Sequence, residues 1–254
     1  MAASNQHIEI GNVRRILSFS ILVVVGAAAV HLARWAQRSA APAHPAAVSG
    51  EGRSAVVVRV DSLLAARERT LRQIAGADTY IPAMLAQSDS ILRRWPIRTE
   101  PLIVYLPEGG APGYTPEMGQ AVRDAFARWQ RVSGIPVVFA FTRDSTRADV
   151  AVRWIAEFPI ERTGQADVRW NRAGWLLSGT LTLATRNPGG IPLPVGAVST
   201  VALHEIGHLL GLGHSDDSGD VMYPTTDMRD DITPRDRRTA RLLYAVPPGS
   251  LKLP

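Results

Sequence analysis

The stretch from His204 to His214 reads HEIGHLLGLGH and contains the residue types that can hold a metal ion. Side chains four residues apart on a helix project from the same face, so His204 and His208 can occupy two corners of a tetrahedral zinc site. Gly211 stands where this helix must end, because glycine adopts the left-handed conformation without a steric penalty. The chain can then bring in His214 as a third ligand, which leaves a fourth position for water.

Glu205 follows the first of these histidines and is expected to act as the general base. A carboxylate beside the metal can accept the proton of a zinc-activated water and deliver it to the leaving amine. The alternative is that the motif decorates a solvated helix face by chance. Its apolar neighbours count against this, because unpaired histidines are costly to bury among them. Moreover, of the six histidines only His7, His31 and His44 lie outside the motif, all in the first 50 residues.

The motif resembles that of the metzincin metallopeptidases and, among them, the matrixins. After the third histidine, the sequence VMYP places Met222 and Pro224 at the spacing of the matrixin Met-turn. The resemblance implies that Met222 forms an apolar floor under the zinc ligands without binding the metal. It also implies that a few residues shape the pocket for the substrate residue after the scissile bond. They are Thr200, on the histidine-bearing helix, and, within residues 223–226, Tyr223, Pro224 and Thr225.

The resemblance covers roughly residues 97–246. It implies an α+β fold of the metzincin-like zincin type, with a twisted mixed β-sheet, an active-site helix and a C-terminal helix. It further implies one catalytic Zn²⁺ and a polypeptide substrate bound as an added strand along an edge of the sheet. Residues 176–185 are the expected edge. The function that follows is that of a zinc-dependent metalloendopeptidase, a hydrolase of peptide bonds.

Two other functions fit the same motif. A catalytically silent, zinc-stabilised module would hold extended peptides without cutting them, and it would lack Glu205 or the open coordination position. A zinc amidohydrolase acting on cell-wall peptides would keep both features, so only substrate tests separate it from an endopeptidase.

The chain departs from the matrixin pattern in its regulatory and structural sites. It has no cysteine, which excludes a thiol switch for latency as well as disulfides and thiolate ligands. No histidines remain for a structural zinc ion. Of the acids in the family's calcium sites only Asp149 is matched, so a Ca²⁺ site is doubtful.

Local signals place regular elements around the motif. A helix is expected to start at Thr115, with proline in its first position, and to end at Gly134. A second, apolar helix begins near Ala197, and the capping box of Thr233 and Asp236 starts a third. Apolar and alternating runs indicate strands at residues 102–106, 136–141, 148–154 and within 174–185.

Residues 16–33 form an apolar run without formal charge, about 27 Å long as a helix, which roughly matches the core of a bilayer. The run is longer than the apolar part of most signal peptides, so a retained transmembrane anchor is favoured over a cleaved one. The catalytic domain would then lie outside the cytoplasm, or be secreted if cleavage occurs. The expected segments are a cytoplasmic tail (1–15), the anchor (16–33), a linker (34–55), a helical segment (56–95) and the catalytic domain (96–248).

Residues 56–95 contain two amphipathic helical patterns, the second extending from Ile81 to Trp95. The segment is either a propeptide that packs on the catalytic domain or an ordinary helical extension, and the sequence leaves both open.

The net charge of +5 does not indicate a nucleic-acid partner. Four arginines and one acidic residue lie in the first 50 residues, so the remaining chain is nearly neutral and has no basic stripe. Nothing in the sequence indicates an oligomeric state.

Overall fold

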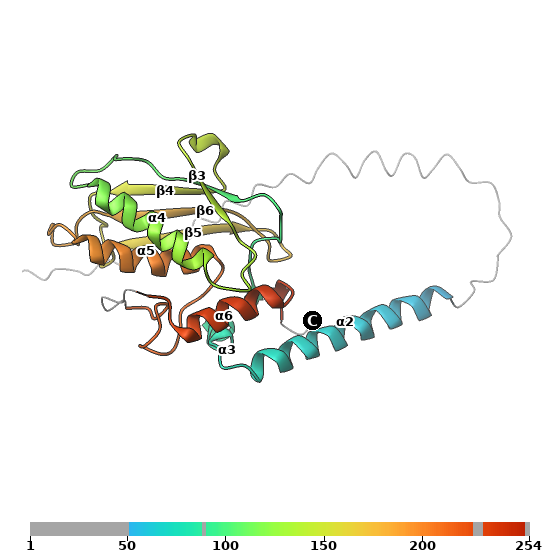
Figure 1. Ribbon diagram of the computed structural model, residues 1–254. Helices are drawn as coiled ribbons and strands as arrows, with labels where there is room; N and C mark the ends of the chain where they lie inside the picture. Colours follow the sequence, from blue (N-terminus) through green and yellow to red (C-terminus); the bar gives the residue numbers. More distant parts are fainter. Residues whose placement is uncertain (1–50, 88–89, 226–230, 252–254) are drawn as a thin grey trace, which may run out of the picture. The chain divides into compact units, whose positions relative to one another are not determined.

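A computed structural model describes residues 51–87, 90–225 and 231–251, and its central element is a five-stranded β-sheet (Figure 1). The strands are β2 (Leu102–Tyr105), β3 (Phe139–Thr142), β4 (Val150–Ile155), β5 (Gly164–Trp170) and β6 (Leu176–Ala184), with a short 3₁₀ helix (Ser145–Arg147) before β4. Their order in the sheet is β3-β2-β4-β6-β5. All pairings are parallel except that of β5 with β6. The sheet is therefore mixed, and mostly parallel.

Strand β5 is an element not predicted from the sequence, and it changes which edge of the sheet is free. Its residues alternate between side chains packed toward the core, such as Ala166 and Val168, and polar side chains such as Asp167. β5 pairs along nearly the full length of β6. The expectation of a free edge within residues 176–185 is therefore wrong. β6 is covered by β5, and β5 is the outermost strand on this side of the sheet.

Two helices, α4 (Pro116–Gln130) and α5 (Val195–Leu209), lie side by side on one face of the sheet (Figure 1). Thr115 has the extended conformation of an N-cap and a proline follows at the first helical position, as predicted. The buried face of α4 meets α5, where the indole N–H of Trp129 donates to the backbone oxygen of Leu203 at 2.8 Å. α4 ends slightly before Gly134, whose positive φ of 85° turns the chain.

The last helix, α6 (Pro234–Ala245), begins with the predicted capping box. The hydroxyl oxygen of Thr233 accepts the backbone N–H of Asp236 at 3.1 Å, and the carboxylate of Asp236 accepts the backbone N–H of Thr233 at 3.0 Å. Near the other end of the helix, the hydroxyl of Tyr244 donates to the backbone oxygen of Leu210 at 3.1 Å. α6 is thus bonded to the residue that follows α5.

The segment before the sheet contains α2 (Glu51–Ala75), α3 (Ile81–Gln87) and the short strand β1 (Ile91–Leu92), which pairs with β7 (Gly249–Ser250). The prediction of a helix extending to Trp95 is therefore wrong. The chain turns at residue 90, which has a φ of 60°, and then pairs as a strand.

This segment contributes to the main hydrophobic core. Its buried core residues are Ile74, Tyr80, Ile81, Met84, Leu92 and Trp95. The indole N–H of Trp95 also donates to the backbone oxygen of Leu209, at the end of α5, with a distance of 2.8 Å. By contrast, Leu63 on α2 is 65% exposed. The part that belongs to the core therefore begins near the end of α2.

The expected membrane anchor at residues 16–33 lies outside the described residues. Among the helices that are described, none is both long and apolar enough to cross a bilayer.

Candidate metal centre

The histidine motif lies at the end of α5 and in the turn that follows. His204 and His208 are on consecutive turns of the helix. Gly211 has a φ of 99°, and its N–H donates to the carbonyl oxygen of His208 at 2.9 Å. The N–H of Leu212 donates to the carbonyl oxygen of Gly207 at 3.0 Å, and the two hydrogen bonds together form a Schellman motif. The chain turns back here as predicted, and this turn carries His214 toward the other two histidines.

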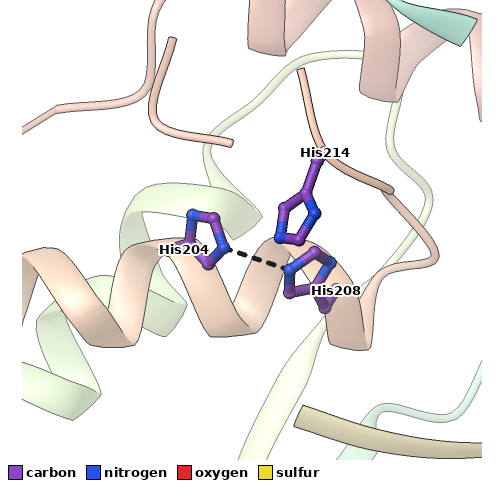
Figure 2. A group of neighbouring side chains, drawn as sticks. All are labelled: His204, His208 and His214. Atoms are coloured by element: carbon purple, nitrogen blue, oxygen red, sulfur yellow. Dashed lines mark hydrogen bonds between the residues drawn. The ribbon is translucent and has the colours of Figure 1, made fainter. Parts of the chain in front are cut away.

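Figure 2 shows His204 and His208 on α5 and His214 on the segment after the turn, with the three rings gathered together. Each residue offers one ring nitrogen, and these nitrogens all lie within 4.8 Å of one another. Three imidazoles with room for one water molecule form the ligand set of a catalytic zinc site. Within the described ranges, no other group of three or more His, Asp or Glu side chains is close enough to hold a metal ion.

The hydrogen bonds of His204 and His208 indicate which ring nitrogen carries the proton. Nδ1 of His204 lies 2.7 Å from the backbone oxygen of Val221, and Nδ1 of His208 lies 2.8 Å from that of Leu212. Because a carbonyl oxygen only accepts, each Nδ1 is the donor and each neutral ring has its lone pair on Nε2. The two Nε2 atoms are 3.1 Å apart (dashed line in Figure 2). Two lone pairs at this distance repel unless they share a cation, so the donor set fits zinc.

Burial keeps these rings neutral. Desolvation lowers the pKa of His204 to about 4 and, together with the nearby His204 ring, lowers the pKa of His208 to about 3. Desolvation also lowers the pKa of His214. A histidine must be deprotonated to bind a metal. All three rings therefore meet this condition at neutral pH.

Glu205 lies beside His204 on α5 and is buried against the free edge strand. Desolvation raises the pKa of its carboxyl to about 7, although a hydrogen bond from the backbone N–H of Ala166 acts in the opposite direction. A Cβ added to Gly164 would lie 3.0 Å from Oε1 of Glu205, so β5 contacts this carboxyl closely. A group with a pKa near neutrality can both accept and donate a proton. The contacts with Ala166 and Gly164 could not be expected without β5.

Met222 is completely buried against the helix that carries the histidines. A Cβ added to Gly207 would lie 2.2 Å from the sulfur of Met222, so only glycine permits this approach. The backbone oxygen of Met222 accepts the N–H of Ser215 at 2.8 Å, which joins the Met222 turn to the residue after His214. Met222 thus packs on the helix that carries His204 and His208. Gly207 was not singled out from the sequence, although a glycine inside an apolar helix is a signal of close packing.

A cavity of about 230 Å³ opens beside the carboxyl of Glu205. Its lining includes Val201, His204, Glu205, Pro224 and Thr225. Thr200 and Tyr223 do not line it. The hydroxyl of Thr200 donates to the backbone oxygen of Gly196 at 3.2 Å, within α5. Val201 lines the cavity instead, because successive helical side chains point about 100° apart.

Asp149, the acid that matches a calcium site, has other partners. Arg98 donates to its two carboxylate oxygens at 2.6 and 3.2 Å, and the backbone N–H of Ile103 donates at 2.8 Å. The positive charge of the Arg98 guanidinium balances the negative charge of this carboxylate. Its observed role is to hold residue 98 against the start of β2.

The site resembles that of a known class of protein. A glycine turn that brings a third histidine back to an HExxH helix, with a buried methionine packed on that helix, is similar to the arrangement of the metzincin metallopeptidases.

Comparison with known proteins narrows the class. The matrixin family matches residues 194–245, which include α5, the three histidines, Met222 and α6. Metalloendoproteinase 5-MMP of Arabidopsis thaliana is 29% identical over 153 residues, 52% of this chain and 39% of the relative. Metalloendoproteinase 2-MMP of the same plant is 40% identical over 78 residues, 30% of this chain and 19% of the relative. Karilysin of Tannerella forsythia is 32% identical over 123 residues, 43% and 25% of the two chains.

Residues 194–245 are accordingly similar to the matrixin family, and the further matches of the chain are to metalloendoproteinases. The chain spans no more than 39% of the length of these three relatives.

Proposed function

We propose that this chain is a zinc-dependent metalloendopeptidase that hydrolyses internal peptide bonds of proteins. The observation that carries the proposal is the 3.1 Å approach of the unprotonated Nε2 atoms of His204 and His208, beside a buried carboxyl. A ring nitrogen of His214 completes the group. The matrixin match and the names of the relatives support the same activity.

The three histidines would hold the ion through one ring nitrogen each. When bound, zinc supplies the Lewis acidity that polarises a carbonyl and acidifies water. Glu205 is the proposed general base, and its carboxylate takes the proton of the attacking water. The protonated carboxyl then donates that proton to the leaving amine. A pKa near 7 suits both steps, because a group works best as base and acid when its pKa is close to the ambient pH.

The substrate is proposed to lie along β5 as an added strand, held by main-chain hydrogen bonds. The cavity beside Glu205 would take the side chain after the scissile bond, with Pro224 and Thr225 in its wall. Thr200 and Tyr223 do not line the cavity, but each precedes a residue that does, Val201 and Pro224 respectively. We therefore propose that they help to position the wall of the pocket.

The test uses the full chain and a mixed peptide library, with the products identified by mass spectrometry. We expect cleavage in the presence of zinc, loss of cleavage with a chelator and recovery when zinc is restored. Glu205→Ala should abolish cleavage while the chain still binds one zinc ion. The matched control is Glu157→Ala, which removes an exposed carboxylate before β5 and should leave cleavage unchanged.

Each other outcome has a distinct meaning. Cleavage that survives both the chelator and Glu205→Ala would contradict the mechanism. Zinc binding without cleavage of any peptide would identify a silent peptide-binding module. Cleavage restricted to cell-wall peptides would identify a zinc amidohydrolase.

We also propose that the catalytic domain lies outside the cytoplasm, attached to the membrane through residues 16–33. The support is the length and apolarity of that run. Membrane fractionation of the full chain and of a chain without residues 16–33 tests it. Equal recovery of both chains in the soluble fraction would contradict the anchor.

A further inference from the structure

A cavity of about 330 Å³ lies at the junction of α4 and α6. Its lining shares no residue with the cavity beside Glu205 and includes none of the three histidines. Four of its seven lining residues are arginines. Arg128 lies in the last turn of α4 and Arg131 directly follows that helix, whereas Arg237 and Arg241 lie on α6. The fold therefore gathers four guanidinium groups from two segments that are distant in sequence.

Arg241 connects the two segments. Its Nε donates to the backbone oxygen of Ser133 and its Nη2 donates to the hydroxyl oxygen of Ser133, both at 3.2 Å. The end of α4 and the side of α6 come together at this contact (Figure 1). A Cβ added to Gly134 would lie 2.7 Å from Cγ of Arg241, so the missing side chain at Gly134 makes room for the arginine. Because both acceptors are neutral oxygens, these hydrogen bonds hold the guanidinium of Arg241 without balancing its charge.

The positive charge of the cavity exceeds the negative charge of the described residues that line it. Its one acidic lining residue is Asp231, whose carboxylate already accepts a hydrogen bond from Nη2 of Arg237 at 2.9 Å. Among the described residues, no carboxylate forms an ion pair with Arg128 or Arg131. The lining has a net charge of +3. Even with the net charge of −1 that residues 226–230 carry in the sequence, an excess of +2 remains.

The like charges around the cavity repel one another. Arg237 and Arg241 are four residues apart on one face of α6, and like charges at this spacing destabilise a helix. Arg128 and Arg131 are three residues apart and repel in the same way, although the negative end of the α4 dipole offsets part of this repulsion. A bound anion would remove the repulsion. This gain is largest for an anion that carries two charges and several oxygens.

We propose that this cavity binds a phosphate group that carries two negative charges, either as the free ion or as a monoester. A guanidinium presents two parallel N–H donors that match the oxygens of phosphate, so several arginines can bind one group together. The four arginines line a single cavity and do not form a stripe, which fits one phosphate group and not the backbone of a nucleic acid. The site is separate from the metal centre, and the inference does not depend on the proposed peptidase function.

The experiment measures the dissociation constant of inorganic phosphate for the full chain by isothermal titration calorimetry, at an ionic strength held constant with sodium chloride. We expect saturable binding of one phosphate per chain. Replacing two of the arginines, by Arg131→Gln and Arg241→Gln together, should weaken this binding by at least about tenfold. The matched control is Arg172→Gln, which removes an exposed arginine between β5 and β6 and should bind phosphate like the wild type. Asp231→Asn removes the acidic lining residue and should bind phosphate more tightly.

A single variant covers the case in which the loss of Arg241 disturbs the fold. Arg131→Gln changes an exposed side chain that has no ion pair among the described residues, and it should weaken phosphate binding by about threefold. Glycerol 3-phosphate distinguishes the two sources of the group. Tighter binding of this monoester than of inorganic phosphate would identify an esterified ligand, and the reverse order would identify the free ion.

Repeating the titration with the neutral chelator 1,10-phenanthroline separates this site from the metal centre. Phosphate that binds through the arginines should bind equally well when the metal has been removed. Loss of binding with the chelator would place the phosphate at the histidines and overturn the inference. Absence of saturable binding in the wild type, or equal dissociation constants in the wild type and both arginine variants, would also overturn it. Each of these results would leave the proposed peptidase function standing.

Discussion

Asp236 is connected to His204 through the backbone of a single residue, Val221. The carboxylate of Asp236 accepts the N–H of Val221 at 2.9 Å, and the oxygen of Val221 accepts the Nδ1 proton of His204 at 2.7 Å. Asp236 is fully buried and also accepts the hydroxyl proton of Tyr80 at 3.1 Å. The start of α6 therefore fixes the carbonyl that orients a proposed zinc ligand.

Asp236→Asn tests this connection. The amide group of asparagine cannot accept all the hydrogen bonds that the carboxylate accepts, because one of its two heteroatoms is a donor. We expect a loss of roughly 2 kcal/mol in the free energy of unfolding and about a tenfold loss in zinc affinity. The measurement is a zinc competition titration at a temperature where both chains are folded.

The control for this variant is Asp231→Asn, because Asp231 is exposed and pairs with Arg237 at 2.9 Å, near the same helix but away from the site. Its zinc affinity should equal that of the wild type. If Asp236→Asn lowered stability without changing zinc affinity, Asp236 would only support the fold.

Gly207→Ala tests the contact between α5 and Met222. In an open helix this change stabilises by about 1 kcal/mol, because alanine has the higher helix propensity. Here the new Cβ would lie 2.2 Å from the sulfur of Met222, so we expect the opposite sign, a destabilisation of roughly 1–3 kcal/mol. Thermal and urea unfolding of the two chains measure the difference.

A double variant separates the steric effect from other causes. Met222→Ala in the Gly207→Ala background removes the clashing sulfur, so the two changes together should cost less than the sum of their separate effects. If the destabilisation of the double variant equalled the sum of the two single effects, the contact between the new Cβ and the Met222 sulfur would not be the cause of the destabilisation.

The parts of the fold that could be predicted from the sequence depend on local signals. The N-cap at Thr115, the capping box at Thr233 and the turn at Gly211 each involve residues within a few positions of one another. The spacing of the motif likewise predicted that His204, His208 and His214 would meet. Local chemistry determines these features, so no knowledge of the rest of the chain was required.

The features that could not be predicted depend on pairings between distant segments. The position of β5 at the sheet edge is set by its pairing with β6, and β1 is a strand because it pairs with residues near the end of the chain. Tyr80 and Asp236 are 156 residues apart in sequence. The apolar pattern of residues 81–95 was interpreted as one helix; its first part forms α3, whereas residues 91–92 form a strand, because burial alone does not distinguish a helix from a short strand.

Removing zinc should make stability depend on pH in a direction set by the buried site. The pKa values of His204 and His208, about 4 and about 3 in the folded chain, lie below the ordinary value of 6.5. Between about pH 5 and 6 the unfolded chain therefore binds two more protons at these residues. The pKa of Glu205, about 7, lies above the ordinary value of 4.5. At Glu205 the folded chain therefore binds one proton more than the unfolded chain.

For His204, His208 and Glu205 the balance is one extra proton on the unfolded chain, and the lowered pKa of His214 acts in the same direction. The free energy of unfolding should therefore rise by at least about 1.4 kcal/mol per pH unit in this window. In Glu205→Gln the opposing contribution disappears and the slope should increase by about 1.4 kcal/mol per pH unit, to at least about 2.7 kcal/mol per pH unit. Urea unfolding in the presence of a chelator, followed by tryptophan fluorescence at several pH values, measures both slopes. A steeper slope in the wild type than in Glu205→Gln would contradict the buried, proton-binding state of Glu205.

Deleting residues 1–96 decides between a propeptide and an integral part of the domain. The deletion removes Tyr80, Ile81, Leu92 and Trp95, all buried in the main core. Burial of one large apolar side chain contributes about 1.5–3 kcal/mol, so together they approach the whole stability of a typical domain. We expect the shortened chain to lose its fold by circular dichroism and to bind no zinc. A removable propeptide would leave a folded chain with activity at least equal to that of the full chain.

A milder change gives a graded result for the same segment. Trp95→Phe keeps an aromatic ring in the core but removes the N–H that donates to the backbone oxygen of Leu209 at 2.8 Å. The carbonyl at the end of α5 is then left without this donor, at a cost of about 1–3 kcal/mol. Because this carbonyl lies next to the turn that positions His214, the same variant should also bind zinc more weakly. Unchanged stability and zinc affinity in Trp95→Phe would mean that the segment before the sheet packs on the domain without holding the site in place.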